Sequence, residues 1–131
     1  MDIKYHKTFE QNKYGEIRAT DNEEMVGRLS YVIDSKRNAW LYKVEVREDY
    51  REQGIGSNLM DIFEDECASM YANSIEGKFY PEIDGNKVRA FYERKGYSIY
   101  KEDYETFVGK FFIEKKDISS LNVVEDKPLE Q

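Results

Sequence analysis

One change of hydrophobic period, between Val46 and Leu59, constrains this chain more than any other feature. Before it, the stretch WLYKVEV (40–46) has the composition of a β-strand, and after it apolar residues recur every three or four positions, as in a helix. The junction REDYREQGIGS contains Arg51-x-x-Gly54-Ile55-Gly56. The sequence therefore predicts a strand that passes through a short glycine loop directly into a helix.

The predicted helix runs from Ile55 to about Asn73. Residues on its apolar face share a spacing of three or four, whereas a second, mostly acidic set falls on the other side. The first set is Leu59, Ile62, Phe63, Cys67, Met70 and Tyr71, and the second is Asp61, Glu64, Asp65 and Ala68.

Strand patterns fill the chain before this helix. DIKYHKTFE and YGEIRAT are short extended runs, and residues 24–33 and 39–46 read as two strands joined by the polar loop DSKRN. Gly27 lies inside the third run, where a glycine often marks a bulge or a close backbone approach.

After the helix, SIEGKFYPE reads as a short strand closed by Pro81. DGNKVRAFYERKG reads as a second helix that ends at Gly96, followed by strands at about 97–101 and 106–113. We expect an α/β fold with one mixed sheet flanked by helices. Residues 1–114 would form a single domain, and residues 115–131 a flexible tail.

Charge and composition exclude several classes of function. The chain has 131 residues and a net charge of −7, which leaves no basic face for nucleic-acid phosphates and is compatible with a cationic partner such as an amine. Cys67 is the single cysteine and His6 the single histidine, so we expect neither an internal disulfide nor a His-rich metal site. No stretch resembles a membrane span or a signal peptide, and we expect a cytoplasmic protein.

The glycine loop admits two interpretations. A strand, a tight glycine turn and a helix start aim free backbone amides at one point, where Gly54 and Gly56 leave room for a phosphate and Arg51 adds charge. The other interpretation is a plain turn with Gly56 or Ser57 near the N-cap. The loop lacks the glycine pattern of a dinucleotide fold and the Gly-Lys-Ser/Thr of a P-loop.

Tyr92 also has two interpretations. In NKVRAFYERKGY it lies near the edge of an apolar helix face, where its hydroxyl could reach a cleft. Alternatively, it is one of the chain's 11 tyrosines and packs its ring in the core.

Together, the loop Arg51 to Gly56 and the later stretch Asn86 to Tyr97 resemble the GCN5-related N-acetyltransferase (GNAT) family. The resemblance runs from about Glu24 to Phe112 and implies a mixed, mostly antiparallel sheet and acetyl-CoA as donor. It implies that loop amides hold the coenzyme A pyrophosphate, that the preceding strand pairs with the pantetheine arm, and that the amide near Val46 polarises the thioester carbonyl. The implied cofactor-binding residues are Val44, Val46, Arg51, Glu52, Gln53, Gly54, Ile55, Gly56, Ser57 and Asn86.

The resemblance also implies direct attack of an amine on the thioester, with Tyr92 protonating the leaving thiolate and no acyl group on Cys67. A lysine-like amine is neutral in only about one molecule in 2,500 at pH 7, so its proton needs an acceptor. Glu45 is the expected base; the alternative is that its carboxylate is merely exposed or paired with a residue of the neighbouring strand. Tyr42 lies on the same strand, and strict alternation would place the two on opposite faces.

The chain departs from the family pattern at two places. Glu52 stands where many members have glycine, and only extended sequence precedes Gly27, so the N-terminal helices of the family are reduced or missing. We expect an N-acetyltransferase for a primary amine of a small molecule, peptide or protein. Its acceptor site would be unusually open, or completed by a larger substrate or by a second subunit, as in a homodimer. The alternative is a non-catalytic module that binds acyl-CoA or another partner.

Overall fold

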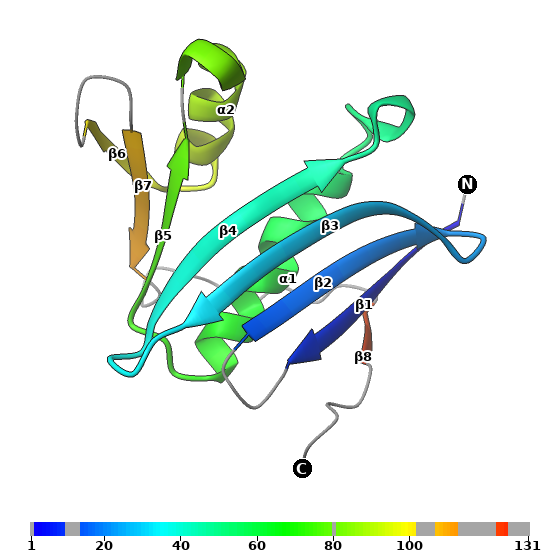
Figure 1. Cartoon of the computed structure of the whole chain (residues 1–131), viewed down its shortest axis with the longest axis horizontal. Coiled ribbons are helices and arrows are strands. Elements are labelled where there is room, and N and C mark those ends of the chain that lie inside the picture. The colour runs from blue at the N-terminus through cyan, green and yellow to red at the C-terminus, as the bar shows by residue number, and fades with distance from the viewer. Residues whose placement is uncertain (1, 10–13, 80, 102–106, 113–122, 126–131) are drawn as a thin grey trace.

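The described residues form one sheet of eight strands in the computed structural model, in the order β6-β7-β5-β4-β3-β2-β1-β8 (Figure 1). The pairs β4–β5 and β1–β8 are parallel and the others are antiparallel, which confirms the predicted mixed, mostly antiparallel sheet. The strands are β1 (Ile3–Phe9), β2 (Tyr14–Asp21), β3 (Glu24–Ile33), β4 (Asn38–Val46), β5 (Ser74–Phe79), β6 (Ser98–Lys101), β7 (Phe107–Phe112) and β8 (Val123–Glu125).

The structure describes residues 2–9, 14–79, 81–101, 107–112 and 123–125, with side chains for 2–9, 14–78 and 87–99. Strand β8, which the sequence did not predict, lies in the expected tail and pairs with β1. The rest of that tail lies outside the described residues. Neither described α-helix is long and apolar enough to cross a bilayer.

Helix α1 (Ile55–Ser69) packs its apolar face on strands β2, β3 and β4 and forms the core with them. Gly27 lies where β3 approaches the start of this helix. A Cβ on Gly27 would lie 3.2 Å from Ile55 Cγ2 and 3.3 Å from Leu59 Cδ1, which confirms the predicted close approach. The fully buried large side chains are Tyr31, Phe63, Ile17, Leu29, Leu59, Met60, Ile75, Val26 and Cys67.

Two details of the α1 prediction were wrong. The helix ends at Ser69, not near Asn73, and Tyr71 beyond its end has a left-handed φ of 59° and is 76% exposed. Glu64, assigned to the polar side, is buried. That side of the helix faces Tyr97, whose pKa is raised by burial and then by the charge of Glu64.

Helix α2 (Pro81–Arg94) begins at Pro81, which the sequence analysis had placed at the end of a strand. Proline is well suited to the first position of a helix, where its missing N–H is no loss. The predicted stop at Gly96 is confirmed. Gly96 has φ 94° and its N–H donates to Glu93 O at 3.0 Å, while Tyr97 N–H donates to Tyr92 O at 3.0 Å, as in a Schellman motif.

Strands β4 and β5 separate partway along their length, as Figure 1 shows. Their parallel pairing runs from Asn38↔Ser74 to Leu41↔Gly77. Beyond Leu41, the edge of β4 up to Val46 has no strand partner among the described residues. The sheet therefore opens into a gap beside the second half of β4.

A bulge in β4 changes which side chains face the core. Ser30 pairs with Lys43 and Tyr31 with Leu41, so Tyr42 has no opposite residue and is 68% exposed. Leu41 is buried, and Val44 and Val46 also pack against the core. The prediction that Tyr42 and Glu45 lie on opposite faces of the sheet is therefore wrong. It assumed strict alternation, whereas the bulge shifts the alternation of core-facing residues by one position.

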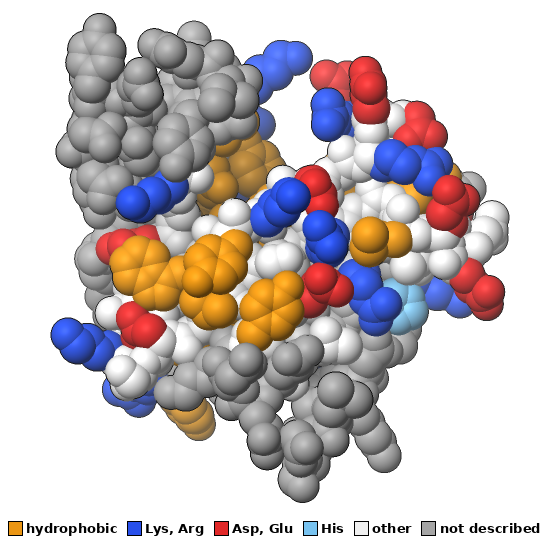
Figure 2. All heavy atoms as spheres, in the orientation of Figure 1, with side chains coloured by type: hydrophobic (Ala, Val, Ile, Leu, Met, Phe, Trp, Pro, Cys, Tyr) orange, Lys and Arg blue, Asp and Glu red, His pale blue; other side chains and the backbone are white. Residues whose placement is uncertain are grey.

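No described helix covers the face of β1–β4 that lies opposite α1 (Figure 1). No described residue before β4 lies in a helix, which confirms that the N-terminal helices are limited. Figure 2 shows this open face, on which apolar side chains lie next to lysine and arginine side chains. Tyr42 contributes to its exposed apolar surface.

Candidate functional site

The start of α1 presents a run of backbone amides without partners. Gly54 is the N-cap with φ 82° and makes no side-chain cap, and the first helical bond runs from Asn58 N to Gly54 O at 2.9 Å. None of the N–H groups of residues 52–57 donates a hydrogen bond to another described residue. Free amides combined with the positive end of the helix dipole give this loop the geometry of an anion-binding site.

A pocket of about 560 Å³ lies over this loop and reaches α2. Its wall contains three cations, Arg51, Lys87 and Arg94, against one carboxylate, Glu52. Lys87 and Arg94 were missed by the sequence analysis, although their separation of seven residues places them on one face of a helix. The remaining lining residues are Val46, Tyr50, Gly54, Ile55, Gly56, Ser57, Ala90 and Phe91.

The unpaired edge of β4 directs its own amides into the gap. The backbone N–H of Arg47 donates to Val26 O at 2.8 Å, so the backbone N–H and C=O of Arg47 point toward β3. In an antiparallel ladder these groups alternate in direction, and those of Val46 and Val44 therefore point away from β3. Arg51 Nε donates to Val46 O at 3.0 Å from that side. The edge remains open for a chain-like ligand that carries amide groups.

Gly56 and Glu52 determine whether the predicted phosphate position is free. A Cβ on Gly56 would contact only Val46 Cγ2, at the ordinary distance of 3.7 Å, so the protein itself does not fill this space. Glu52 has a left-handed φ of 63° and its side chain is 87% exposed. Its carboxylate is oriented to solvent and lies 4.0 Å from Lys87 Nζ.

Tyr92 is buried, and its ring contacts the Tyr97 ring with centroids 5.3 Å apart. This is the apolar contact that accompanies a Schellman motif. Its neighbours Ala90 and Phe91 line the pocket, whereas Tyr92 does not. Asn86 lies in α2, and its side chain is outside the described residues.

Glu45 is paired with two cations. Its carboxylate lies 2.8 Å from Arg28 Nη2 and 3.4 Å from Lys43 Nζ. Desolvation would raise the pKa of Glu45, but the hydrogen bond from Arg28 and the charge of Lys43 outweigh it, and the pKa is lowered. A carboxylate held in this way is a weak proton acceptor.

Lys95 links the two helices that form the site. Its Nζ donates to Ser57 O at 3.1 Å and forms an ion pair with Asp61, and both side chains are largely buried. Ser57 is in the first turn of α1, whereas Lys95 follows α2. The sequence analysis did not predict this link, because the two residues are 38 positions apart.

Cys67 is fully buried in the core, and burial raises the pKa of its thiol well above the usual range. It therefore lacks the thiolate character of a nucleophile. Among the described residues, no group of three or more His, Cys, Asp or Glu side chains is arranged to hold a metal ion.

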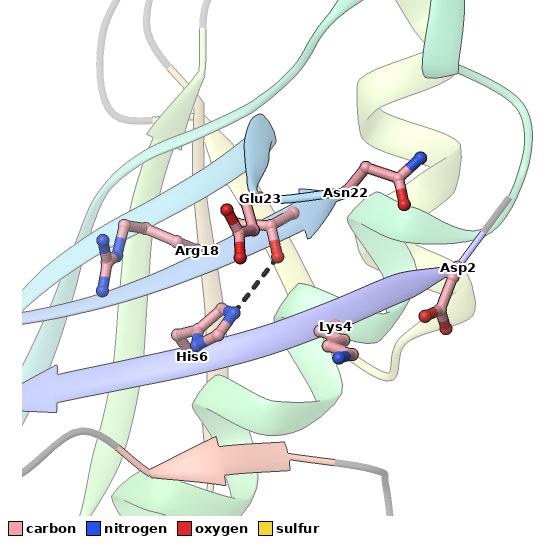
Figure 3. A pocket seen from close by; sticks show the side chains of 7 residues that line it. Asp2, Lys4, His6, Arg18, Asn22 and Glu23 are labelled. Carbon is pink, nitrogen blue, oxygen red and sulfur yellow. Dashed lines mark hydrogen bonds between the residues drawn. The ribbon is translucent and has the colours of Figure 1, made fainter.

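A separate hollow of about 560 Å³ lies over β1, β2 and the β2–β3 turn (Figure 3). It mixes cations with carboxylates, and His6 Nε2 lies 3.1 Å from Thr20 Oγ1. No helix start faces it, so it lacks the free amides found at α1. The lining residues are Asp2, Lys4, His6, Arg18, Thr20, Asn22 and Glu23.

Comparison with known proteins places this geometry in a family. The family model described as "Acetyltransferase (GNAT) domain" matches residues 14–99. No curated protein matches the sequence significantly. The matched range contains the glycine loop, the open edge of β4 and α2.

Solved structures share the fold at low sequence identity. A GNAT-family acetyltransferase from Staphylococcus aureus Mu50 is 17% identical, with a TM-score of 0.69 over 78% of this chain and 69% of its own. The PaiA N-acetyltransferase from Thermoplasma acidophilum, solved with coenzyme A, is 15% identical, with a TM-score of 0.70 over 76% of this chain and 61% of its own. The ribosomal-protein-S18-alanine N-acetyltransferase from Escherichia coli is 19% identical, with a TM-score of 0.63 over 75% and 66%.

Proposed function

The chain belongs to the GNAT acetyltransferase domain family, and on this basis we propose that it transfers an acetyl group from acetyl-CoA to a primary amine. One observation supports this proposal most strongly. The free amides of residues 52–57 lie next to the open edge of β4, and Val46 and Arg51 belong to both features. Coenzyme A combines a pyrophosphate with an amide-bearing arm, which matches this pair of features.

We assign the pyrophosphate to the loop from Arg51 to Ser57 and to the helix dipole of α1. The cations Lys87 and Arg94 supply further charge for the phosphates. The pantetheine arm would pair with the backbone of Val44 and Val46, as an added strand pairs with a sheet edge. Asn86 remains a proposed contact of the same arm, by resemblance to the family.

In the proposed reaction, the amine nitrogen attacks the thioester carbonyl carbon and the C–S bond breaks. The Val46 N–H would donate to the carbonyl oxygen as negative charge develops on it. The acceptor ammonium must first give one proton to a base, which frees the nitrogen lone pair for the attack. Tyr92 would protonate the leaving thiolate and regain a proton from the acetylated nitrogen. The products are an N-acetylated amine, coenzyme A and one proton, with no acyl group on the protein.

Tyr92 and Glu45 are the two catalytic assignments that need direct tests. Tyr92 is buried beside the pocket wall formed by Phe91, so a small rotation of α2 or the arrival of coenzyme A has to expose its hydroxyl. Glu45 is exposed but is held by Arg28 and Lys43.

A second function, a non-catalytic module that binds acyl-CoA, is favoured by the burial of Tyr92. The two functions differ in thiol release. We propose a screen of spermidine, a lysine-containing peptide, a peptide with a free N-terminus and an aminoglycoside, each with acetyl-CoA and a thiol reagent. An enzyme releases thiol faster with at least one amine than with acetyl-CoA alone. Binding of acetyl-CoA without any such increase would contradict the enzymatic function and support the module.

The helix-free face of the sheet is a candidate surface for the acceptor or for a second copy of the chain. The helix-free face of β1–β4 borders the end of β4, where the acetyl group would lie. We propose that a peptide, a larger acceptor or a second copy of the chain covers this face. Light scattering with and without the best amine of the screen distinguishes a homodimer from a monomer that binds its acceptor alone.

A further inference from the structure

Two pockets meet at the end of β4. The first is the pocket over the glycine loop, and the second, of about 370 Å³, lies beside β3 and the turn that follows β4. Val46 and Arg51 line both. If acetyl-CoA occupies the first pocket, as the proposed function requires, an amine in the second can reach the carbonyl beside Val46. The second pocket is lined by Met25, Val26, Gly27, Arg28, Glu45, Val46, Arg47, Glu48 and Arg51.

This second pocket contains two carboxylates in different states. Glu45 is neutralised by Arg28 at 2.8 Å and Lys43 at 3.4 Å. The Glu48 side chain is exposed and makes no hydrogen bond or ion pair with any other described residue. Protonating Glu45 would break two ion pairs, whereas protonating Glu48 breaks none.

The backbone that carries Glu48 is held firmly although its side chain is not. Glu48 begins the 3-10 turn η1 (Glu48–Tyr50). On one side of it, Arg47 contacts Glu24 at 2.5 Å and Asp49 at 2.7 Å. On the other side, the Tyr50 hydroxyl donates to Asp21 at 2.6 Å. The turn is thereby joined to the β2–β3 end of the sheet, and Glu48 lies in the lining of the second pocket.

We propose that Glu48, and not Glu45, accepts the proton of the attacking amine, directly or through one water. The acceptor enters as an ammonium, and its nitrogen must lose a proton before its lone pair can form the new C–N bond. Glu48 takes that proton and passes it to solvent, because the side chain is exposed. The electron pair of the broken C–S bond leaves with sulfur. The inference depends on the proposed function for the position of the thioester.

The test compares Glu48→Gln with Glu45→Gln and wild type, using the fastest amine of the screen and measuring kcat/KM from pH 6.5 to about pH 10. A lost general base costs about 10²-fold in rate. We expect this loss in Glu48→Gln at pH 7 and a smaller one in Glu45→Gln. Because a lysine-like amine has a pKa near 10.4, the loss should shrink as the pH approaches about 10. A merely structural role for Glu48 would give a loss that does not depend on pH.

Glu23→Gln provides a matched control. Glu23 is an exposed carboxylate in the β2–β3 turn and lines neither the pocket over the glycine loop nor the pocket that contains Glu48. Calorimetry must show wild-type affinity for acetyl-CoA in all three variants. A Glu48→Gln enzyme within threefold of wild type at pH 7 overturns the assignment while leaving the proposed function intact. If wild type itself acetylates none of the amines, the proposed function fails, and the role of Glu48 fails with it.

Discussion

Arg51 donates from Nε to the carbonyl oxygen of Val46 at 3.0 Å, and this bond joins the glycine loop to the open edge of β4. The loop supplies amides for an anion, and the edge supplies amides for an extended arm. Arg51 therefore links the two before any ligand arrives. Both parts of the proposed donor site are therefore present in the structure without a ligand.

Replacing Glu52 by glycine should both stabilise the fold and strengthen acetyl-CoA binding. The φ of 63° at this position is unfavourable for a residue with a Cβ, and Glu52 adds a negative charge to the lining of the proposed phosphate pocket. We expect Glu52→Gly to gain about 0.5–1 kcal/mol in urea unfolding, after the entropic cost of glycine. Glu52→Gln separates the effects, because it removes the charge and keeps the strain. A Glu52→Gly protein less stable than Glu52→Gln would contradict this account.

The link between Lys95 and α1 should be visible in stability. Lys95→Met leaves the largely buried Asp61 without its partner, and we expect a loss of about 2 kcal/mol in urea unfolding. Adding Asp61→Asn should cost less than it does in wild type, since the two residues form one pair. Lys4→Met, at an exposed lysine, is the control and should change stability by less than about 0.5 kcal/mol. Additive losses in the double variant would show that the pair is not coupled.

Tyr92→Phe separates the two interpretations of that tyrosine. The variant keeps the ring contact with Tyr97 and removes only the hydroxyl. If Tyr92 is the general acid, the transfer rate falls about tenfold or more while acetyl-CoA affinity stays unchanged. Tyr97→Phe removes a nearby buried hydroxyl as a comparison and should leave the rate closer to wild type. An unaltered rate in Tyr92→Phe would leave the tyrosine a packing residue.

Cys67 should be inert in the native protein. Its thiol is fully buried and its pKa is raised, first by burial and then by the charges of Glu66 and Glu64. A thiol reagent should label it only after urea unfolds the chain. Cys67→Ala should retain the transfer rate at a cost of about 1 kcal/mol in stability. Loss of transfer with acetyl-CoA binding intact would indicate an acyl-enzyme step.

The sequence predicted those features that depend on local rules. Gly27 and Gly96 were identified because a close approach and a helix stop each favour glycine, and both predictions were confirmed. The change of period after Val46 located the strand, the loop and the start of α1 in the correct order.

Features that depend on distant residues escaped prediction. The bulge at Tyr42 arises from pairing with β3, and it overrode the alternation read from β4 alone. Helical spacing placed Glu64 on the solvent-exposed side of α1. It is buried, because Tyr97, which is distant in the sequence, lies beside it. In the same way, only the structure distinguishes the paired Glu45 from Glu48, since Arg28, the nearer of the two cations that pair with Glu45, comes from the neighbouring strand β3.

Calorimetric titration of Gly56 variants with acetyl-CoA tests whether the amides before and within the first turn of α1 bind its phosphates. Gly56→Ala adds a methyl group at an ordinary contact distance from Val46 and should still bind acetyl-CoA, more weakly. Gly56→Glu places a carboxylate at the proposed phosphate position and should abolish binding, with circular dichroism confirming that the fold is retained. If Gly56→Glu binds acetyl-CoA as tightly as wild type, the loop does not hold the phosphates and the account is wrong.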